Sequence, residues 1–403
     1  MRILVVSHTY IVDINREKFK ILANLEPGIE VIIVVPRRWK PGGVQNQIIE
    51  TQFYQEGSFK VVPLSNFSQN NQALLTFGRD LIKLLRQFKP QIIQVEQGSK
   101  SLAYTQLIIL NYLLGLKEKN IFFTWWNLPY KLKFPVSWLE AYNLKYTDGI
   151  IAGNLAGSEI LRQRGYQGII KVMPQLGVDE NLFMPAYKNT ELSNLLEIKS
   201  TNFVVGFVGR FVEEKGLLTL AKALADLKEH NWKWLLVGRG ELRTHLVDKA
   251  IEWGINDRLI WVESVSHNQV PEYINLMNVL VLPSETSYKF KTLTAVGWKE
   301  QFGHVLIEAM ACKVPVIGSN CGEIPHVIGD AGLVFPEGNV EALRDCLIQL
   351  MEVPELAADL GKRGYERVMV HYTNQALARQ LLDFYQELLY QFNMKLHRIR
   401  LQE

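Results

Sequence analysis

The feature that most constrains the fold of this chain is a regular alternation of short, unbroken apolar runs with longer amphipathic stretches. Apolar runs such as RILVVS (residues 2–7) and EVIIVV (30–35) are separated by helical patterns such as REKFKILANL (16–25). Strands that are apolar on both faces are typical of a parallel sheet that helices cover on both sides. The alternation therefore predicts doubly wound α/β layers.

A polar break divides this pattern into two halves. The chain has 403 residues, which is too long for one ordinary core. Residues 184–200 are polar and lack a clear period, and the pattern restarts with NFVVGFVG (202–209). We therefore predict an N-terminal Rossmann-like domain over residues 1–186 and a second one over 187–372.

The last segment, residues 373–403, predicts one long amphipathic helix with a basic end. We expect it to return and pack across the first domain. The alternative is that the helix lies on a membrane surface. Two such domains are expected to bind ligands in a cleft at the carboxyl ends of their strands.

Composition limits the class of protein. Hydrophobic residues make up 48% and charged residues 21%, as in folded soluble domains. The three cysteines form no C-x-x-C pair, which indicates free thiols in a reducing compartment. No signal peptide is visible, and the longest apolar stretch (107–116) is too short to span a bilayer. We expect a cytoplasmic protein, with a location at the inner face of the membrane as the alternative.

Charge is distributed unevenly along the chain. Residues 1–190 hold 22 Lys+Arg and 14 Asp+Glu, a balance of +8, whereas the remainder holds 22 and 27, a balance of −5. A basic first half favours an anionic partner or an anionic membrane surface, and ordinary solvated lysines are the alternative explanation.

A first candidate site is VGRFVEEKG (208–216), which follows a predicted strand. Gly209 allows a tight turn, and Arg210 and Lys215 flank the loop with two cations. A guanidinium and an ammonium at this spacing suit a diphosphate. The alternative is a pair of surface cations balanced by the two glutamates between them.

A second candidate site is GWKEQFGHVLIEAMA (297–311), in which a helix is expected to begin near Gly303. The start of a helix favours an anion, so a phosphate is expected there. Glu308 lies in the second turn and suits the two hydroxyls of a ribose. Glu300 precedes the helix and suits the transferred group or charge that develops on it. Gly238, in the turn VGRGELRTHL, either passes close to the ligand or only permits a tight turn.

Several motifs are missing. No Walker A loop or H-E-x-x-H occurs, and the first strand leads into SHTYIVD rather than G-x-G-x-x-G, which argues against a dinucleotide dehydrogenase. No D-x-D is present, so a metal carrying the diphosphate is not indicated. The two cations would take its place.

Taken together, these motifs resemble the retaining glycosyltransferases of family 4, which have the GT-B fold of two facing Rossmann-like domains. The resemblance rests on GR-x-x-x-x-KG (209–216), EQFGHVLIEAMA (300–311), VLPS (281–284), PVIGSNCGEIPHVI (315–328), GLVFPEG (332–338) and GVDENLFMP (177–185). It covers almost all of the second half of the chain, whereas the first half matches in pattern more than in residues.

The resemblance implies transfer of a sugar from a nucleoside diphosphate sugar to a glycan or lipid-linked acceptor, with retention of anomeric configuration. It implies no metal and no further cofactor, and no nucleic acid is expected as a partner. Arg210, Lys215 and Glu300 are implied as the catalytic group. The implied donor-binding residues are Gly209, Arg210, Lys215, Gly238, Glu300, Phe302, Gly303, His304, Val305 and Glu308.

Three positions depart from the family pattern. The first turn lacks the Gly-Gly pair of many relatives, Trp126 or Asn127 stands where many carry a histidine, and Lys313 replaces a usual glycine. His8, at the end of the first strand, is the remaining candidate on the acceptor side, together with Trp126 and Asn127. The first two departures leave an inactive donor-binding subunit of a transferase complex as an alternative, and a nucleotide-sugar epimerase is another.

Overall fold

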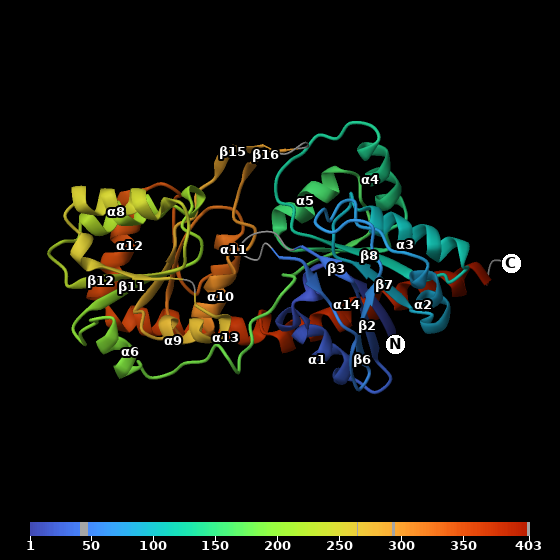
Figure 1. Ribbon diagram of the computed structural model, residues 1–403, viewed down its shortest axis with the longest axis horizontal. Helices are drawn as coiled ribbons and strands as arrows, with labels where there is room; N and C mark the ends of the chain where they lie inside the picture. Colours follow the sequence, from blue (N-terminus) through green and yellow to red (C-terminus); the bar gives the residue numbers. More distant parts are fainter. Residues whose placement is uncertain (41–46, 264, 292–294, 401–403) are drawn as a thin grey trace. The chain divides into compact units, whose positions relative to one another are not determined.

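Two compact units divide the chain, and each is built around a largely parallel sheet (Figure 1). The computed structural model describes residues 1–40, 47–263, 265–291 and 295–400, with side chains described up to residue 390. The first unit comprises Met1–Gly177 together with Asn374–Glu403, and the second comprises Val178–Thr373.

The first unit contains an eight-stranded sheet in the order β10-β9-β8-β7-β1-β2-β6-β5. All neighbouring strands are parallel except β5, which pairs antiparallel with β6 at the edge. The strands are β1 (Arg2–Val6), β2 (Glu30–Pro36), β5 (Tyr54–Glu56), β6 (Phe59–Leu64), β7 (Ile92–Val95), β8 (Lys119–Thr124), β9 (Gly149–Ala152) and β10 (Ile169–Val172), with a small separate pair β3 (Arg38–Trp39) and β4 (Ile49–Glu50).

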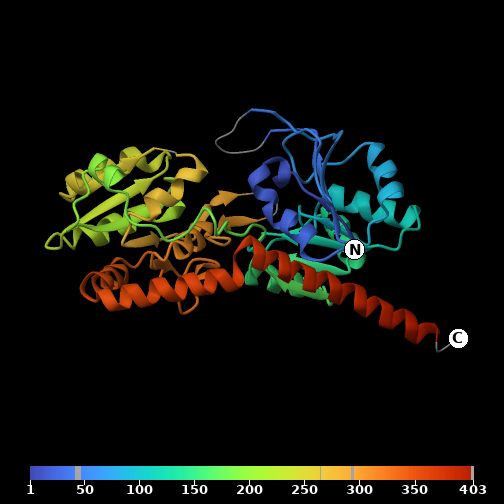
Figure 2. The ribbon, with the colours of Figure 1, turned by 90° about the horizontal axis from the view of Figure 1, so that it is seen from below.

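Helices cover this sheet, as the apolar strands require. They are α1 (Glu17–Leu25), α2 (Asp80–Phe88), α3 (Leu102–Leu113), α4 (Val136–Lys145), α5 (Leu155–Gln163) and α14 (Asn374–Arg400), and short 3-10 turns η1 (Thr9–Ile11) and η2 (Asp13–Arg16) follow β1. The long helix α14 lies along one side of the unit and packs against α1 (Figure 2). Its Tyr385 hydroxyl donates a hydrogen bond to Gln94 Oε1 on β7 at 2.7 Å. Residues 401–403 of the predicted last helix lie outside the described residues.

The second unit contains a six-stranded parallel sheet in the order β13-β12-β11-β14-β17-β18. Its strands are β11 (Phe203–Val208), β12 (Trp232–Val237), β13 (Leu259–Val262), β14 (Val279–Leu282), β17 (Val316–Ser319) and β18 (Leu333–Phe335). Its helices are α6 (Thr190–Leu195), α7 (Leu217–Ala225), α8 (Leu242–Glu252), α9 (Val270–Ile274), α10 (His304–Ala311), α11 (Ile324–Ile328), α12 (Val340–Glu352) and α13 (Pro354–His371), with 3-10 turns η3 (Glu213–Lys215), η4 (Asn256–Arg258) and η5 (His267–Gln269).

An antiparallel hairpin, β15 (Ser287–Lys291) and β16 (Val296–Trp298), lies between β14 and α10. Period-based reasoning treats this stretch as a loop, so the hairpin is an addition to the predicted fold. It places Trp298 just ahead of Glu300.

The boundary between the units differs from the predicted one. We expected the first domain to end at residue 186, but the second unit begins at Val178. The backbone N–H of Val178 donates to the carbonyl of Tyr372 at 2.9 Å, and that of Ala186 donates to Asn275 Oδ1 at 3.0 Å. The polar composition of residues 184–200 predicts an exposed linker. The hydrogen bonds of Val178 and Ala186, however, join residues 178–186 to the second unit.

Each sheet has a strand at which the direction of strand addition reverses, and ligands of open α/β sheets bind beyond the carboxyl ends of such strands. In the first unit this strand is β1, between β7 and β2; in the second it is β11, between β12 and β14. His8 follows β1 and Gly209 follows β11, so sequence-predicted residues lie at both points. Over the described residues, no helix combines the length and apolar character needed to cross a bilayer.

Candidate functional site

The turn after β11 is held by close backbone packing. Gly209 has a φ of +154° and its N–H donates to the carbonyl of Val237 at 3.0 Å. Gly238, with a φ of +141°, lies directly against it: a Cβ added to Gly238 would stand 2.0 Å from the Gly209 carbonyl oxygen. Only glycine fits such an approach. Gly238 thereby supports the turn that carries Arg210, and its role toward a ligand stays a prediction.

Arg210 projects outward from this turn. Its side chain is 64% exposed, and its guanidinium lies 3.6 Å from Glu214 Oε1. Glu214 is itself buried, and its carbonyl accepts a hydrogen bond from the N–H of Glu285 at 2.9 Å. Because Glu214 pairs with only one side of the Arg210 guanidinium, the other N–H groups can donate hydrogen bonds to an incoming phosphate.

Lys215 and Glu300 form an ion pair in which both side chains are largely buried. Glu300 Oε2 also accepts a hydrogen bond from the hydroxyl of Ser284 at 2.8 Å. The ammonium of Lys215 lies 5.2 Å from the centre of the Trp298 ring, so the cation contacts a carboxylate and an aromatic face. The structure thus brings together two of the three predicted catalytic residues, whereas Arg210 pairs elsewhere.

The backbone of Glu300 is fixed as well as its side chain. Its carbonyl accepts a hydrogen bond from the N–H of Glu323 at 3.2 Å, in the turn before α11. The carbonyl of Ser284 accepts in turn from the hydroxyl of Ser319 at the end of β17. Glu300 is therefore held by the loops that follow β14 and β17, which are adjacent strands of the sheet.

Helix α10 begins directly after this point. Gly303 adopts the left-handed conformation (φ +84°, ψ +58°), and the helix runs from His304. The buried ring of Phe302 packs against the rings of His304 and Tyr372, which fixes the approach to the helix. The first N–H groups of a helix, here those of His304 and Val305, have no acceptor within the helix and favour an anion. The N-cap residue is Gly303, which has no side chain to cap this end.

Glu308 lies one turn further along α10. Its side chain is only partly exposed, and burial raises its pKa from 4.5 to about 7. Within the described part of the chain, no hydrogen bond or ion pair reaches its carboxylate. A half-buried acid without donors is costly for the empty protein, and hydroxyl donors from a ligand would relieve that cost.

These features define a site at the carboxyl edge of the second sheet. A cation, the positive end of a helix and an outward guanidinium favour a polyanion, while two carboxylates offer acceptors for hydroxyl groups. A ligand that carries both a diphosphate and sugar hydroxyls matches this set. Among the described residues, no cluster of three or more His, Cys, Asp or Glu side chains could hold a metal ion.

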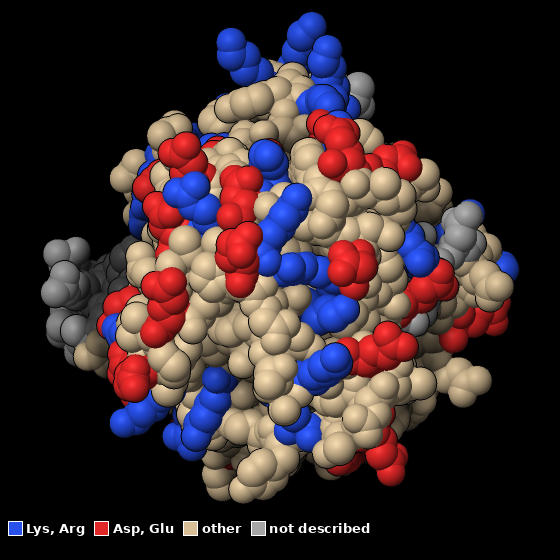
Figure 3. All heavy atoms as spheres, turned by 90° about the vertical axis from the view of Figure 1, so that its left-hand side faces the viewer, with Lys and Arg blue, Asp and Glu red and all other residues tan. Residues whose placement is uncertain are grey.

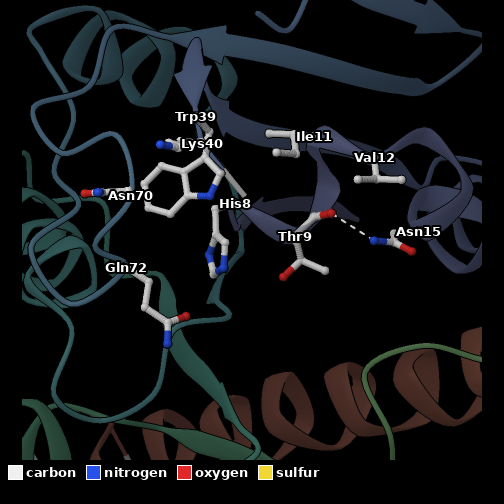
Figure 4. A pocket seen from close by; sticks show the side chains of 9 residues that line it. All are labelled: His8, Thr9, Ile11, Val12, Asn15, Trp39, Lys40, Asn70 and Gln72. Atoms are coloured by element: carbon white, nitrogen blue, oxygen red, sulfur yellow. Dashed lines mark hydrogen bonds between the residues drawn. The ribbon is translucent and has the colours of Figure 1, made fainter. Parts of the chain in front are cut away.

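The first unit contains a cavity of about 400 Å³ beyond the carboxyl ends of β1 and β2 (Figure 4). His8 points into it, with Thr9 and Gln72 nearby, and the nearly buried ring of Trp39 packs on His8 at 5.0 Å. Burial lowers the pKa of His8 to about 4, so the imidazole is neutral at neutral pH. Its Nδ1 is buried and has no hydrogen-bond partner among the residues that the structure describes. The remaining lining residues are Ile11, Val12, Asn15, Lys40 and Asn70.

The other two acceptor-side candidates do not line this cavity. The indole N–H of Trp126 donates to the carbonyl of Leu128 at 2.5 Å, and Lys100 Nζ lies 4.3 Å from the centre of the Trp126 ring. Asn127 is buried. At the position where relatives are expected to carry a histidine, this chain therefore has side chains that take part in local packing.

Sequence reasoning missed several residues that line the cavity of the first unit: Trp39, Lys40, Asn70 and Gln72. Ser284, Trp298 and Ser319 of the second unit were noted only as parts of motifs. The missed residues come from distant loops, and no local pattern marks them. The nearest available signal was position, because Ser284 and Ser319 each follow or end an apolar strand.

The surface of the second unit shows no accumulation of one charge sign on the face in Figure 3, where described acidic and basic side chains are interspersed. Ion pairs on this unit, such as Lys222–Asp226 and Lys249–Glu252, illustrate the mixing. The negative balance of the second half is therefore not concentrated on this face.

Comparison with known proteins identifies what the second unit is similar to. Residues 188–367 match the family model described as "Glycosyl transferases group 1". The chain is 28% identical over 215 residues to N-acetyl-alpha-D-glucosaminyl L-malate synthase of Bacillus anthracis, covering 53% of this chain and 52% of that protein. It is 28% identical over 194 residues to the capsular polysaccharide biosynthesis glycosyltransferase CapM of Staphylococcus aureus, covering 47% of each. The chain thus spans about half the length of these curated relatives.

The likeness in three dimensions extends over nearly the whole chain. The crystal structure of HepE from Anabaena in complex with UDP superposes with a TM-score of 0.68, covering 96% of this chain and 100% of that one at 16% sequence identity. At this identity the likeness concerns the fold, and it confirms the predicted class of two Rossmann-like α/β domains of the GT-B type.

Proposed function

We propose that this chain, whose residues 188–367 match the family model of glycosyl transferases group 1, transfers a sugar from a nucleoside diphosphate sugar to a hydroxyl group of a glycan or lipid-linked acceptor. The observation that carries the proposal is the cluster at the start of α10. There Lys215 pairs with Glu300, the helix begins after Gly303, and Glu308, whose carboxylate has no hydrogen-bond or ion-pair partner among the described residues, lies one turn inside the helix.

In the proposed donor complex, the diphosphate lies at the first turn of α10 and contacts Lys215 and Arg210. Lys215 is paired with Glu300 in the structure described here, so the phosphate competes with that carboxylate for the ammonium. Glu308 accepts hydrogen bonds from the ribose hydroxyls, and Glu300 faces the sugar that is transferred. This division explains why one acid precedes the helix and another lies a turn inside it.

The proposed reaction retains the anomeric configuration and needs no protein nucleophile. The acceptor oxygen attacks the anomeric carbon from the face that the phosphate leaves, the bond from carbon to phosphate oxygen breaks, and the acceptor proton passes to the departing phosphate. Lys215, Arg210 and the helix start stabilise the negative charge on the leaving nucleoside diphosphate. Such stabilisation by fixed cations and dipoles makes a metal ion unnecessary in this proposal.

We assign the acceptor to the cavity around His8 in the first unit. Its lining offers hydroxyl and amide groups, namely those of Thr9, Asn15, Asn70 and Gln72, which suit sugar hydroxyls. The neutral His8, whose Nδ1 lacks a partner, can exchange a hydrogen bond with such a hydroxyl. Lys40 adds one positive charge for an anionic substituent on the acceptor.

Measuring release of nucleoside diphosphate from a panel of donor sugars, with and without candidate acceptors, tests the proposal. We expect release with one donor class and a clear increase with the correct acceptor. Tight donor binding without release across the panel would favour the inactive donor-binding subunit, an alternative that the buried Asn127 and the packed Trp126 keep open. Interconversion of the donor sugar without net release would favour an epimerase.

A further inference from the structure

A row of aromatic side chains runs along helix α4 in the first unit. Trp138 is 62% exposed and Tyr146, at the end of the helix, 45%, and the partly exposed Tyr142 lies between them. Residues four apart lie on one face of a helix. The rings of Trp138 and Tyr142 stack at 5.8 Å, and those of Tyr142 and Tyr146 lie 4.8 Å apart, so these three rings form a continuous row. Phe134, which precedes the helix, is 81% exposed.

The opposite face of α4 is the one that anchors the helix to its unit. Glu140 is fully buried and accepts a hydrogen bond from the hydroxyl of Ser99 at 2.7 Å. Asn143, also buried, accepts from the hydroxyl of Thr105 at 2.8 Å. The usual arrangement is reversed here, because the buried face of α4 is polar and the outer face is aromatic.

The neighbouring helix α3 also carries exposed apolar side chains. Tyr112 and Leu113 are strongly exposed, and Ile109 is exposed to a lesser degree. Helices α3 and α4 are in contact, and Figure 1 shows them next to each other in the first unit. We call the exposed side chains at Ile109, Tyr112, Leu113, Phe134, Trp138 and Tyr146 the aromatic face. Exposed apolar side chains grouped on two neighbouring helices are a mark of interaction sites.

Exposed lysines adjoin the aromatic face in the sequence, and Lys145 Nζ lies 5.4 Å from the centre of the Tyr146 ring. Four lysines between residues 109 and 148 are exposed, namely Lys117, Lys131, Lys133 and Lys145. The three acids in the same stretch contribute little negative surface. Glu118 is partly buried, Glu140 is buried and bonded to Arg164, and Asp148 is paired with Lys119 at 2.7 Å.

We propose that the aromatic face docks on the surface of an anionic lipid bilayer. Tryptophan and tyrosine favour the interface between lipid and water because their rings are apolar and their polar groups stay hydrated. Lysines beside such rings are attracted to anionic headgroups, and together the two terms give reversible binding without insertion across the bilayer. None of its residues belongs to the donor or the acceptor site described above, and docking would bring the first unit to a lipid-linked acceptor if the proposed function holds.

Co-sedimentation of the full chain with lipid vesicles tests the proposal. We expect binding to vesicles of phosphatidylcholine mixed with phosphatidylglycerol, weaker binding to phosphatidylcholine alone, and loss of binding as salt is raised. Phe134→Ser combined with Trp138→Ser, or Lys131→Glu combined with Lys133→Glu, should each weaken binding by at least about tenfold. Phe67→Ser and Lys83→Glu change equally exposed side chains of the same unit outside this face and should bind like the wild type.

Circular dichroism and thermal unfolding of each variant establish that it is folded. Absence of wild-type binding to anionic vesicles, or equal binding by the face variants and their controls, would overturn the proposal. A dimer that the Phe134 and Trp138 variants abolish would show that the face binds a second protein chain instead. Release of nucleoside diphosphate with a soluble acceptor should not change in these variants, so failure of docking and failure of the proposed chemistry are distinguishable.

Discussion

Replacing Glu308 by glutamine should have opposite effects on stability and on donor binding. Burial raises the pKa of this carboxyl from 4.5 to about 7, so the folded protein binds its proton more tightly than the unfolded chain does. Stability is therefore lost as the pH rises from the unfolded to the folded pKa. At about 1.4 kcal/mol per pKa unit, the ionised carboxylate costs up to about 3 kcal/mol near pH 8. Glutamine keeps the shape and removes this cost.

Urea unfolding of the ligand-free protein measures the first effect. Glu308→Gln should be more stable than the wild type by about 2–3 kcal/mol near pH 8, and by less than about 1 kcal/mol near pH 5, where the wild-type carboxyl is protonated in the fold. The matched control is Glu229→Gln, which changes an exposed acid of the same unit. It should show no such dependence on pH.

The donor KM as a function of pH measures the second effect. Ribose hydroxyls donate to the ionised carboxylate, whose population rises from about a tenth near pH 6 to about nine tenths near pH 8. Donor affinity of the wild type should therefore rise by up to about ninefold over this range, whereas Glu308→Gln should bind weakly and without this dependence. A flat wild-type profile together with an unchanged stability difference would refute the assignment of Glu308.

Three further predictions follow from the same site. Arg210→Ala and Lys215→Ala should each lower kcat/KM, because a charge-assisted phosphate contact is lost; the expected loss of transition-state stabilisation is about 2–4 kcal/mol. Lys222→Ala, which changes an exposed lysine on α7, is the control. Full activity of both site variants would contradict the assignment. EDTA should leave activity unchanged, and loss of activity that magnesium restores would disprove metal independence. Gly238→Ala should destabilise the second unit by at least about 2 kcal/mol in urea unfolding, since its methyl group would lie 2.0 Å from a carbonyl oxygen. The control is Gly57→Ala, whose methyl group meets no atom within 4 Å and which should cost about 1 kcal/mol or less.

The parts of the fold that the sequence predicts are those set by local periodicity. The helical patterns at 16–25 and 101–116 appear as α1 (Glu17–Leu25) and α3 (Leu102–Leu113), with small changes at the ends. The amphipathic stretch LLTFGRDLIKLLRQF (74–88) predicts a helix from residue 74, but α2 begins only at Asp80, and Phe77 forms a β-bridge with Asn66 instead. The apolar character of a residue before a helix does not show whether its backbone pairs with a distant segment.

Strands that lack an unbroken apolar run were harder to recognise. β6 (Phe59–Leu64) contains Lys60 and Pro63, and it lies near the edge of its sheet with only β5 beyond it. The hairpin β15–β16 has exposed side chains on most of its length, so its sequence resembles a loop. In both cases pairing with a neighbouring strand, rather than local pattern, determines the structure.

The candidate site was predictable where one segment supplies several of its groups. Gly303, His304 and Glu308 lie on one helix start, and their spacing alone indicates an anion with hydroxyls beside it. The pairing of Lys215 with Glu300 was not predicted, because the two residues are 85 positions apart and meet only through the order of the strands. Lys313 shows the reverse case: its φ of +58° is a left-handed conformation that favours glycine, the residue that the family resemblance predicts there, although this chain has lysine.

The central claim is that the start of α10 holds the diphosphate of an activated sugar, and a structure of the protein with a bound nucleoside diphosphate tests it most directly. The account predicts phosphate oxygens within hydrogen-bond distance of Lys215 Nζ and of the backbone N–H groups of His304 or Val305, with the ribose hydroxyls on Glu308. A nucleotide bound away from α10, with the Lys215–Glu300 pair and Glu308 untouched, would contradict it.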